Sequence, residues 1–170
     1  MNTSLNWLNR YLSAPVTAQE AEDVLTHVGF PFESKQEQTP ASGKPDWLMD
    51  VEITSNRGDC LSHIGLAREI AAKTGRTLVM PTAPAPKHAG RVQDFLKLTN
   101  TTPRECPRFT AQVIRGVRVG PSPAWIREAL ESVGQRSINN VVDVTNFITL
   151  EMGNPCHVFD LDRLEGRALT

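Results

Sequence analysis

The chain of 170 residues has few cysteines, little excess of charge of either sign and no long apolar run. Its three cysteines, Cys60, Cys106 and Cys156, are an odd number without close pairing or metal-ligand spacing, which fits a reducing compartment better than a disulfide framework. A formal net charge of −1 argues against a generally basic nucleic-acid binder, and DNA is not an expected partner. No segment approaches the ~18 apolar residues of a spanning helix, and no signal-peptide pattern is visible. We therefore expect a soluble, cytoplasmic protein without a membrane partner.

What the sequence does contain is enough apolar content for a core, 39% of its residues, and a clear order of elements. A Thr-x-x-Glu capping box at Thr17 and a glycine at Gly29 bound the clearest helix. A turn at 55–59 with Asp59 as N-cap is expected to lead into a second helix. The first part of the chain is thus predicted to contain helices at residues 4–12, 17–29 and 61–75 and strands at residues 30–38 and 47–54.

Prolines and alanines crowd residues 81–90 and predict a semi-rigid extended linker. The predicted organisation is an N-terminal α+β domain at 1–80, a linker at 81–92 and the incomplete start of a second α+β domain at 93–170. The second domain is expected to contain a possible strand at 95–98, a strand at 109–119, a helix capped by Ser122 with Pro123 at its first position, and a β run at 141–150. Arg115 and Arg118 could contact phosphates, although solvated charges on a strand face explain them more simply.

Residues 137–160 combine apolar and polar side chains in an order that a simple core strand does not need. His157 follows the helix- and strand-breaking Gly153 and Pro155. The polar residues interspersed among the apolar ones are Asn139, Asn140, Asp143, Thr145 and Asn146. An amide, a hydroxyl and an imidazole could converge on a small polar pocket with apolar walls. The alternative is that the asparagines of this stretch form turns and caps, and that His157 is a hydrogen-bonded core histidine.

This stretch, read as INNVVDVTNFITLEMGNPCHVFDLDRLEG, closely resembles the start of the editing domain, of the tRNA-binding B3/B4 type, in the β subunit of bacterial phenylalanyl-tRNA synthetase. Residues 106–140 resemble the lead-in to that domain, and residues 50–75 resemble the end of the subunit's first domain. The opening NTSLNWLNRYL agrees with the same order. The RNA-binding OB-type module that commonly lies between the first helix and the strand at 47–54 is missing from this sequence.

The resemblance implies a function and partners. In the family, a catalytic α subunit activates phenylalanine with ATP and magnesium and charges tRNA-Phe, while the β subunit holds the tRNA and hydrolyses wrongly attached tyrosine. Thr145, Asn146 and His157 match positions of the editing pocket, where they would orient the substrate and water, with His157 as a possible general base. The family's carboxylate that recognises tyrosine lies past residue 170. The resemblance assigns no residue here to aminoacylation, to a cofactor or to a metal.

Two other functions remain open, a noncatalytic scaffold that positions RNA and a free-standing hydrolase of mischarged tRNA. The second needs a complete pocket, and the sequence predicts no further sheet partner after residue 160. We expect the 170 residues to be the N-terminal piece of a longer subunit or a truncated reading frame. By this interpretation the protein is part of a phenylalanine–tRNA ligase, and the chain alone is inactive.

Overall fold

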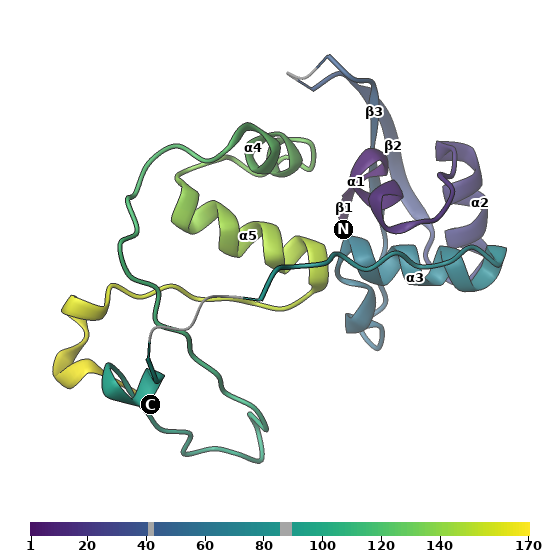
Figure 1. The fold of residues 1–170 in the computed structure, drawn as a ribbon. Helices are drawn as coiled ribbons and strands as arrows, with labels where there is room; N and C mark the ends of the chain where they lie inside the picture. The colour runs from purple at the N-terminus through teal and green to yellow at the C-terminus, as the bar shows by residue number, and fades with distance from the viewer. Residues whose placement is uncertain (41–42, 86–89) are drawn as a thin grey trace. The chain divides into compact units, whose positions relative to one another are not determined.

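The computed structural model describes residues 1–40, 43–85 and 90–170, and its helices and small sheets confirm the predicted α+β class (Figure 1). Short 3-10 helices connect several of the elements. In chain order, the helices and strands are β1 (Asn2–Ser4), α1 (Leu5–Leu8), α2 (Ala18–His27), β2 (Phe32–Gln38), β3 (Asp46–Val51), α3 (His63–Thr74), β4 (Lys97–Leu98), α4 (Ala124–Glu131), α5 (Asn140–Met152) and β5 (Ala168–Leu169). No helix in the described ranges is both long enough and apolar enough to span a bilayer.

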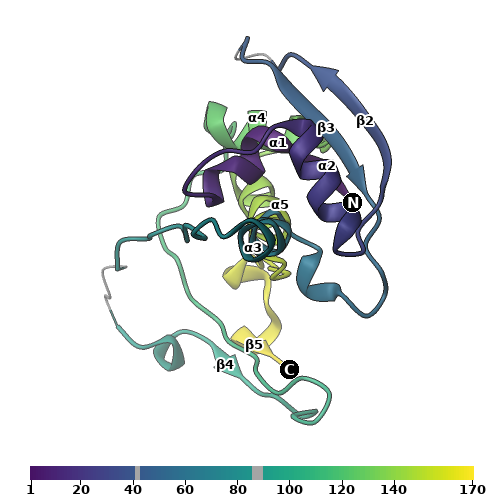
Figure 2. The same ribbon diagram turned by 90° about the vertical axis from the view of Figure 1, so that its right-hand side faces the viewer.

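The larger sheet has the order β1-β3-β2, with both pairs antiparallel. The central strand β3 alternates between buried and partly exposed side chains, and Met49 and Val51 are fully buried. Such alternation is typical of a sheet with one face on the core. The strands predicted at 30–38 and 47–54 are therefore confirmed as β2 and β3. Figure 2 shows the two long strands beside α1 and α2.

Side-chain caps define the helices α2 and α3. The Thr17 hydroxyl accepts a hydrogen bond from the Glu20 N–H at 3.1 Å, which is one half of the predicted capping box, while the Glu20 carboxylate binds Arg76 instead of the Thr17 N–H. Gly29 adopts φ +96°, as predicted for the end of the helix. The predicted cap at Asp59 is wrong. The N-cap of α3 is Ser62, whose hydroxyl accepts from the Gly65 N–H at 3.0 Å, because a 3-10 turn at Gly58–Cys60 intervenes before the helix begins.

The β run predicted at 141–150 is wrong, since these residues form helix α5. The Asn139 side chain accepts hydrogen bonds from the N–H groups of Val141 and Val142, both at 3.0 Å, and a left-handed Gly153 ends the helix. The β-branched residues lower helix propensity only slightly, so capping and tertiary packing decide the conformation. The alternative interpretation of the asparagines as caps is correct for Asn139.

The strand predicted at 109–119 is also wrong, because these residues have no regular secondary structure. A strand needs a neighbouring strand to satisfy its backbone groups, and the sheets of the described residues include no strand paired with this segment. The strand suggested at 95–98 is reduced to the two residues of β4, which pair in parallel with β5. Because β5 lies after residue 160, the expectation of no further sheet partner there is wrong. Ser122 does not cap α4: Pro123 occupies the N-cap position, and the Ser122 hydroxyl bonds to Asp143 instead.

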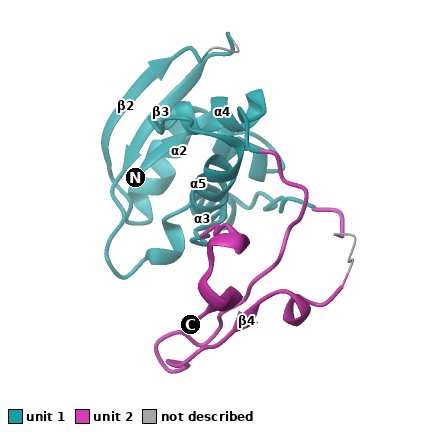
Figure 3. Ribbon diagram, turned by 90° about the vertical axis from the view of Figure 1, so that its left-hand side faces the viewer, with its two compact units in different colours: residues 1–82, 119–156 teal, residues 83–118, 157–170 magenta. Residues whose placement is uncertain are grey.

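The described residues form two compact units, coloured separately in Figure 3. Unit 1 comprises residues 1–82 and 119–156, and unit 2 comprises residues 83–118 and 157–170. This grouping does not follow the predicted order of two domains around a linker at 81–92, because α4 and α5 pack with the N-terminal elements. Residues 86–89 of that linker lie outside the described residues. The domain boundaries of the predicted family organisation remain a prediction.

Candidate functional site

Thr145 and Asn146 lie in the middle of α5, and both are partly exposed. The Thr145 hydroxyl donates to the Val142 carbonyl at 2.7 Å, so its proton is already used within the helix. The Asn146 side chain makes no hydrogen bond to any described residue. Its amide is therefore free to donate to a ligand and to accept from one.

His157 belongs to unit 2 and is exposed, with its ring centroid 6.4 Å from that of Phe159. The alternative of a hydrogen-bonded core histidine is therefore wrong. The positions of the two units relative to one another are not determined. Convergence of His157 with Thr145 and Asn146 on one pocket accordingly remains a prediction.

The N-terminal half of α5 is held by the buried carboxylate of Asp143. It accepts hydrogen bonds from the hydroxyls of Ser122 and Ser137, both at 2.5 Å, and from the Ile138 N–H at 2.8 Å. Burial by itself raises the pKa of Asp143, but these hydrogen bonds and one from the Asn139 N–H outweigh it, so the pKa lies below its usual value. Asp143 is thus a charged anchor that joins α5 to the segments on either side of α4.

The middle of α5 is held by aromatic stacking. The Phe147 ring stacks on Trp7 with centroids 4.8 Å apart, and Trp7 stacks in turn on His63 at 4.0 Å. The rings of Trp125 in α4 and Phe147 are nearly perpendicular, with centroids 5.2 Å apart. Trp7 and His63 are almost completely buried, so this column of rings belongs to the core of unit 1.

Two buried polar contacts hold the C-terminal half of α5. The Tyr11 hydroxyl donates to Glu151 Oε1 at 2.5 Å and accepts from the Trp7 indole N–H at 2.9 Å. His63 accepts from the Ser4 N–H through Nε2 at 3.2 Å, which leaves Nδ1 to donate to the Leu150 carbonyl at 2.9 Å. Burial and the contact with Glu151 both raise the pKa of Tyr11, which stays protonated.

Both ring nitrogens of His63 are used by the neutral tautomer. Burial lowers the pKa of His63 to about 4, and the hydrogen bond to Leu150 offsets this only in part. Protonation would place a second N–H against the N–H of Ser4. His63 is therefore a neutral structural bridge between β1, α3 and α5.

These contacts put the anchoring side chains of α5 on one side of the helix and fix its rotation in unit 1. Asp143, Phe147 and Glu151 repeat every four residues and are all buried, while Asn146 falls outside this stripe. A partly exposed amide on a rigid helix can orient a ligand through hydrogen bonds. In the part of the chain that the structure describes, no base accepts the proton of the Thr145 hydroxyl, so Thr145 is not activated as a nucleophile.

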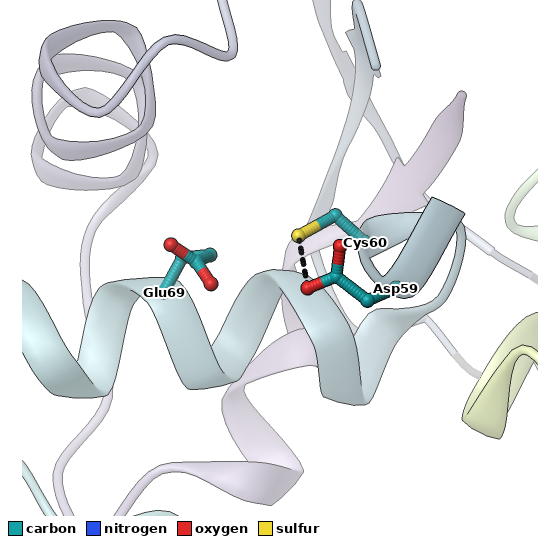
Figure 4. A group of neighbouring side chains, drawn as sticks. All are labelled: Asp59, Cys60 and Glu69. Carbon is teal, nitrogen blue, oxygen red and sulfur yellow. Dashed lines mark hydrogen bonds between the residues drawn. The ribbon is translucent and has the colours of Figure 1, made fainter. Parts of the chain in front are cut away.

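A second polar cluster lies at the start of α3, where Asp59, Cys60 and Glu69 bring potential metal-ligand atoms within 4.8 Å of one another (Figure 4). The Arg57 guanidinium already binds this group. It donates to Asp59 at 3.0 and 3.1 Å and to Glu69 at 2.7 Å, and one of its nitrogens lies 3.1 Å from the Cys60 sulfur. Arg68 adds a further bond to Asp59 at 2.6 Å.

Electrostatics support a structural role for this cluster. The hydrogen bonds from Arg57 lower the pKa of Asp59 to about 2, whereas burial raises the pKa of Cys60 to about 11. A protonated thiol is a poor nucleophile and a poor metal ligand. Arg57 and Arg68 supply the positive charge that a metal would otherwise provide. Their hydrogen bonds connect the 3-10 turn to α3.

The sequence analysis did not predict how α5 is held in place, and it grouped Asp143 with the candidate pocket residues. His63 follows a serine cap, Tyr11 ends a short helix and Glu151 ends an apolar run, and each looks ordinary in its local context. Asp143 was expected in a strand. The available signal for Asp143 was the Asn139-x-x-x-Asp143 pattern at a helix start, where an acidic residue in the first turn is favourable.

Residues 105–170 match the family described as B3/4 domain, which includes α4 and α5. Over 168 residues, 98% of this chain, the sequence is 46% identical to the phenylalanine–tRNA ligase β subunit of Rhodopirellula baltica. It is 52% identical over 120 residues, 71% of the chain, to the β subunit of Syntrophus aciditrophicus, and 49% identical over 126 residues, 74% of the chain, to that of Syntrophotalea carbinolica.

The chain belongs to the phenylalanine–tRNA ligase β-subunit family, which confirms the resemblance seen in the sequence. The matches cover 24% of the Rhodopirellula subunit, 15% of the Syntrophus subunit and 16% of the Syntrophotalea subunit. The chain thus spans about a quarter or less of the length of these relatives.

Proposed function

We propose that the chain is part of the β subunit of a phenylalanine–tRNA ligase and contributes to charging tRNA-Phe in an assembly with a catalytic α subunit. The observation that carries this proposal is the 46% identity to such a subunit across 98% of the chain. ATP and magnesium would act in the assembled enzyme, and no described residue of this chain is assigned to either. The predicted cytoplasmic location follows from the same role.

Association with an α subunit tests this assignment. The full chain, co-expressed with the α subunit of the same organism, is expected to co-purify with it and to show no phenylalanine charging when assayed alone. The matched control is an α subunit from an unrelated synthetase. Charging of tRNA-Phe by the 170 residues alone, or failure to associate with the α subunit, would contradict the proposal.

We propose further that α5 contributes to editing, in which tyrosine is removed from mischarged tRNA-Phe. Asn146 supports this because its partly exposed amide has no partner among the described residues and is carried on a firmly anchored helix. A site that hydrogen-bonds the tyrosine hydroxyl leaves its polar groups unpaired when phenylalanine enters, which is worth several orders of magnitude of discrimination. His157 would supply an imidazole suited to proton transfer near neutral pH.

Asn146→Ala and His157→Ala in the assembled enzyme test the editing role. If each side chain acts in the transition state, either change should slow tyrosyl-tRNA hydrolysis by roughly 10²-fold and leave phenylalanine charging intact. Val144→Ala is a matched control, because Val144 is an exposed neighbour on the same helix. Thr145→Val should have a smaller effect, since its proton is bonded within α5.

Thermal melting separates the editing role from a structural one. Asn146 and His157 are not in the core, so their replacement should leave the melting temperature within about a degree of the unmodified enzyme. A parallel loss of charging, hydrolysis and stability would instead assign these residues to folding. Unchanged hydrolysis in both variants would favour the noncatalytic scaffold, which the shared core of α5 and the N-terminal elements also supports.

A further inference from the structure

Positive charge is concentrated in one stretch of unit 2. Residues 95–119 contain five basic side chains and one acidic side chain, Glu105, although the whole chain has a net charge of −1. The remainder of the chain is therefore acidic. The basic residues are Lys97, Arg104, Arg108, Arg115 and Arg118.

Three of these arginines are exposed and form no salt bridge within the described part of the chain, namely Arg104, Arg108 and Arg115. Arg115 is held over the Phe95 ring, with its guanidinium carbon 5.6 Å from the ring centroid. Stacking of this kind orients a guanidinium and leaves its edge donors available. By contrast, Arg57, Arg68 and Arg76 of unit 1 each bind a carboxylate.

The same stretch exposes an aromatic ring between its charges. Phe109 follows Arg108 directly and is 41% exposed. Between residues 99 and 118 the chain forms neither a helix nor a strand that could enter the groove of a duplex, and it runs through the magenta unit of Figure 3 as an irregular trace. Arginines that meet phosphates, together with an exposed ring on which a base can stack, are the means by which proteins bind single-stranded nucleic acid.

We propose that residues 104–115 form a surface for single-stranded RNA, with Arg104, Arg108 and Arg115 on phosphates and Phe109 under a base. The choice of RNA rests on the proposed role in tRNA charging, and the surface would hold an unpaired part of that RNA. Phosphate contacts carry no sequence information, so the surface contributes affinity and position rather than choice of tRNA.

Fluorescence anisotropy with a labelled single-stranded RNA of about twelve nucleotides tests the surface, using the full chain at several salt concentrations. The combined variant Arg104→Gln, Arg108→Gln and Arg115→Gln should lower the slope of log K against log[salt] by about 2, because each phosphate contact to a single strand contributes roughly 0.7. A control variant removes three exposed charges from unit 1 through Lys44→Gln, Lys73→Gln and Arg136→Gln. This control should keep most of the slope.

Variants of Phe109 distinguish the contribution of base stacking to RNA affinity from the contribution of charge. Phe109→Leu should weaken binding by roughly tenfold while leaving the salt slope unchanged, and Phe109→Tyr should keep the affinity. Circular dichroism and thermal melting of each variant should match the unmodified chain, since all replaced side chains are exposed.

Several outcomes would overturn the proposal. These are absence of RNA binding at low salt, equal losses in the control variant, no effect of Phe109→Leu, equal affinity for a duplex of the same length, or tighter binding to vesicles of anionic phospholipid. Association with the α subunit is a separate measurement. A chain that binds the α subunit but no RNA refutes the surface alone, whereas one that binds RNA but no α subunit refutes the proposed function.

Discussion

The two units of the chain differ in how much apolar surface they bury. Among the described residues, every buried apolar side chain except Leu96 belongs to unit 1. Unit 2 has one parallel pair of two-residue strands, β4 and β5, and otherwise short turns and 3-10 helices. Unit 1 can therefore offset the entropy of ordering its chain through burial, and unit 2 has little with which to do so.

This difference bears on function because the B3/4 domain match at 105–170 includes parts of both units. Helices α4 and α5 pack in the core of unit 1, whereas residues 104–115 in unit 2 are mostly exposed and have no regular secondary structure. Regions with few buried contacts are the ones that open most readily and adapt to a partner. We expect α5 to act as a rigid support and unit 2 to adjust to what it binds.

The largest expected effect comes from removing the central ring of unit 1. Trp7→Ala should lower the free energy of unfolding by about 3–5 kcal/mol, because Trp7 is 1% exposed, stacks on two rings and donates to Tyr11. Phe159→Ala is the comparison in unit 2, where the ring is 54% exposed, and should change stability by less than about 0.5 kcal/mol. Urea unfolding measures both. Equal losses would show that unit 2 is as well packed as unit 1.

The next effect is a dependence of folding stability on pH that arises from His63. Its pKa is about 4 in the folded chain and 6.5 ordinarily, so the unfolded chain binds more protons between these pH values. The contribution of neutral His63 to the free energy of unfolding is complete above about pH 6.5 and is lost as the pH falls to about 4. The free energy of unfolding changes by about 3 kcal/mol over this range.

Urea unfolding between pH 7 and pH 4 measures this loss. His63→Gln should flatten the profile in that window, because an amide can accept from Ser4 and donate to Leu150 without gaining a proton. The lowered pKa values of Asp59 and Asp143 make the free energy of unfolding depend on pH in a more acidic range than this one. A profile that the variant leaves unchanged would assign the acid sensitivity to other groups.

The smallest of the three effects tests the close contact between the 3-10 turn and α3. A methyl group added at Gly65 would lie 2.2 Å from the Asp59 carbonyl oxygen and 2.9 Å from the Cys60 Cα, and both are backbone atoms. Gly65→Ala should therefore cost about 1–3 kcal/mol of unfolding free energy. Gly58→Ala is the matched control, because nothing lies within 4 Å of its added carbon. Similar unfolding midpoints for the two variants would mean that the turn shifts without cost.

Local sequence signals were sufficient where the structure depends on neighbours along the chain. The helix after Thr17 and its end at Gly29 follow from hydrogen bonds within a few residues, and β3 follows from alternation over six residues. The family was also recognisable from the sequence, because similarity over long blocks can be seen without knowing the contacts. Thr145, Asn146 and His157 were chosen in the same way, and their joint role is still a prediction.

Tertiary structure decided whatever depends on distant partners. Residues 109–119 have the composition of a strand but no described neighbour to pair with, and residues 140–152 are rich in β-branched side chains yet form a helix. That helix is held by Tyr11 and His63, which are 140 and 87 residues away from Glu151 and Leu150. Likewise, the Arg57 guanidinium binds the potential metal-ligand atoms of Asp59, Cys60 and Glu69. Propensity describes one residue and its neighbours, whereas buried hydrogen bonds and ring stacking require partners that only the folded chain brings together.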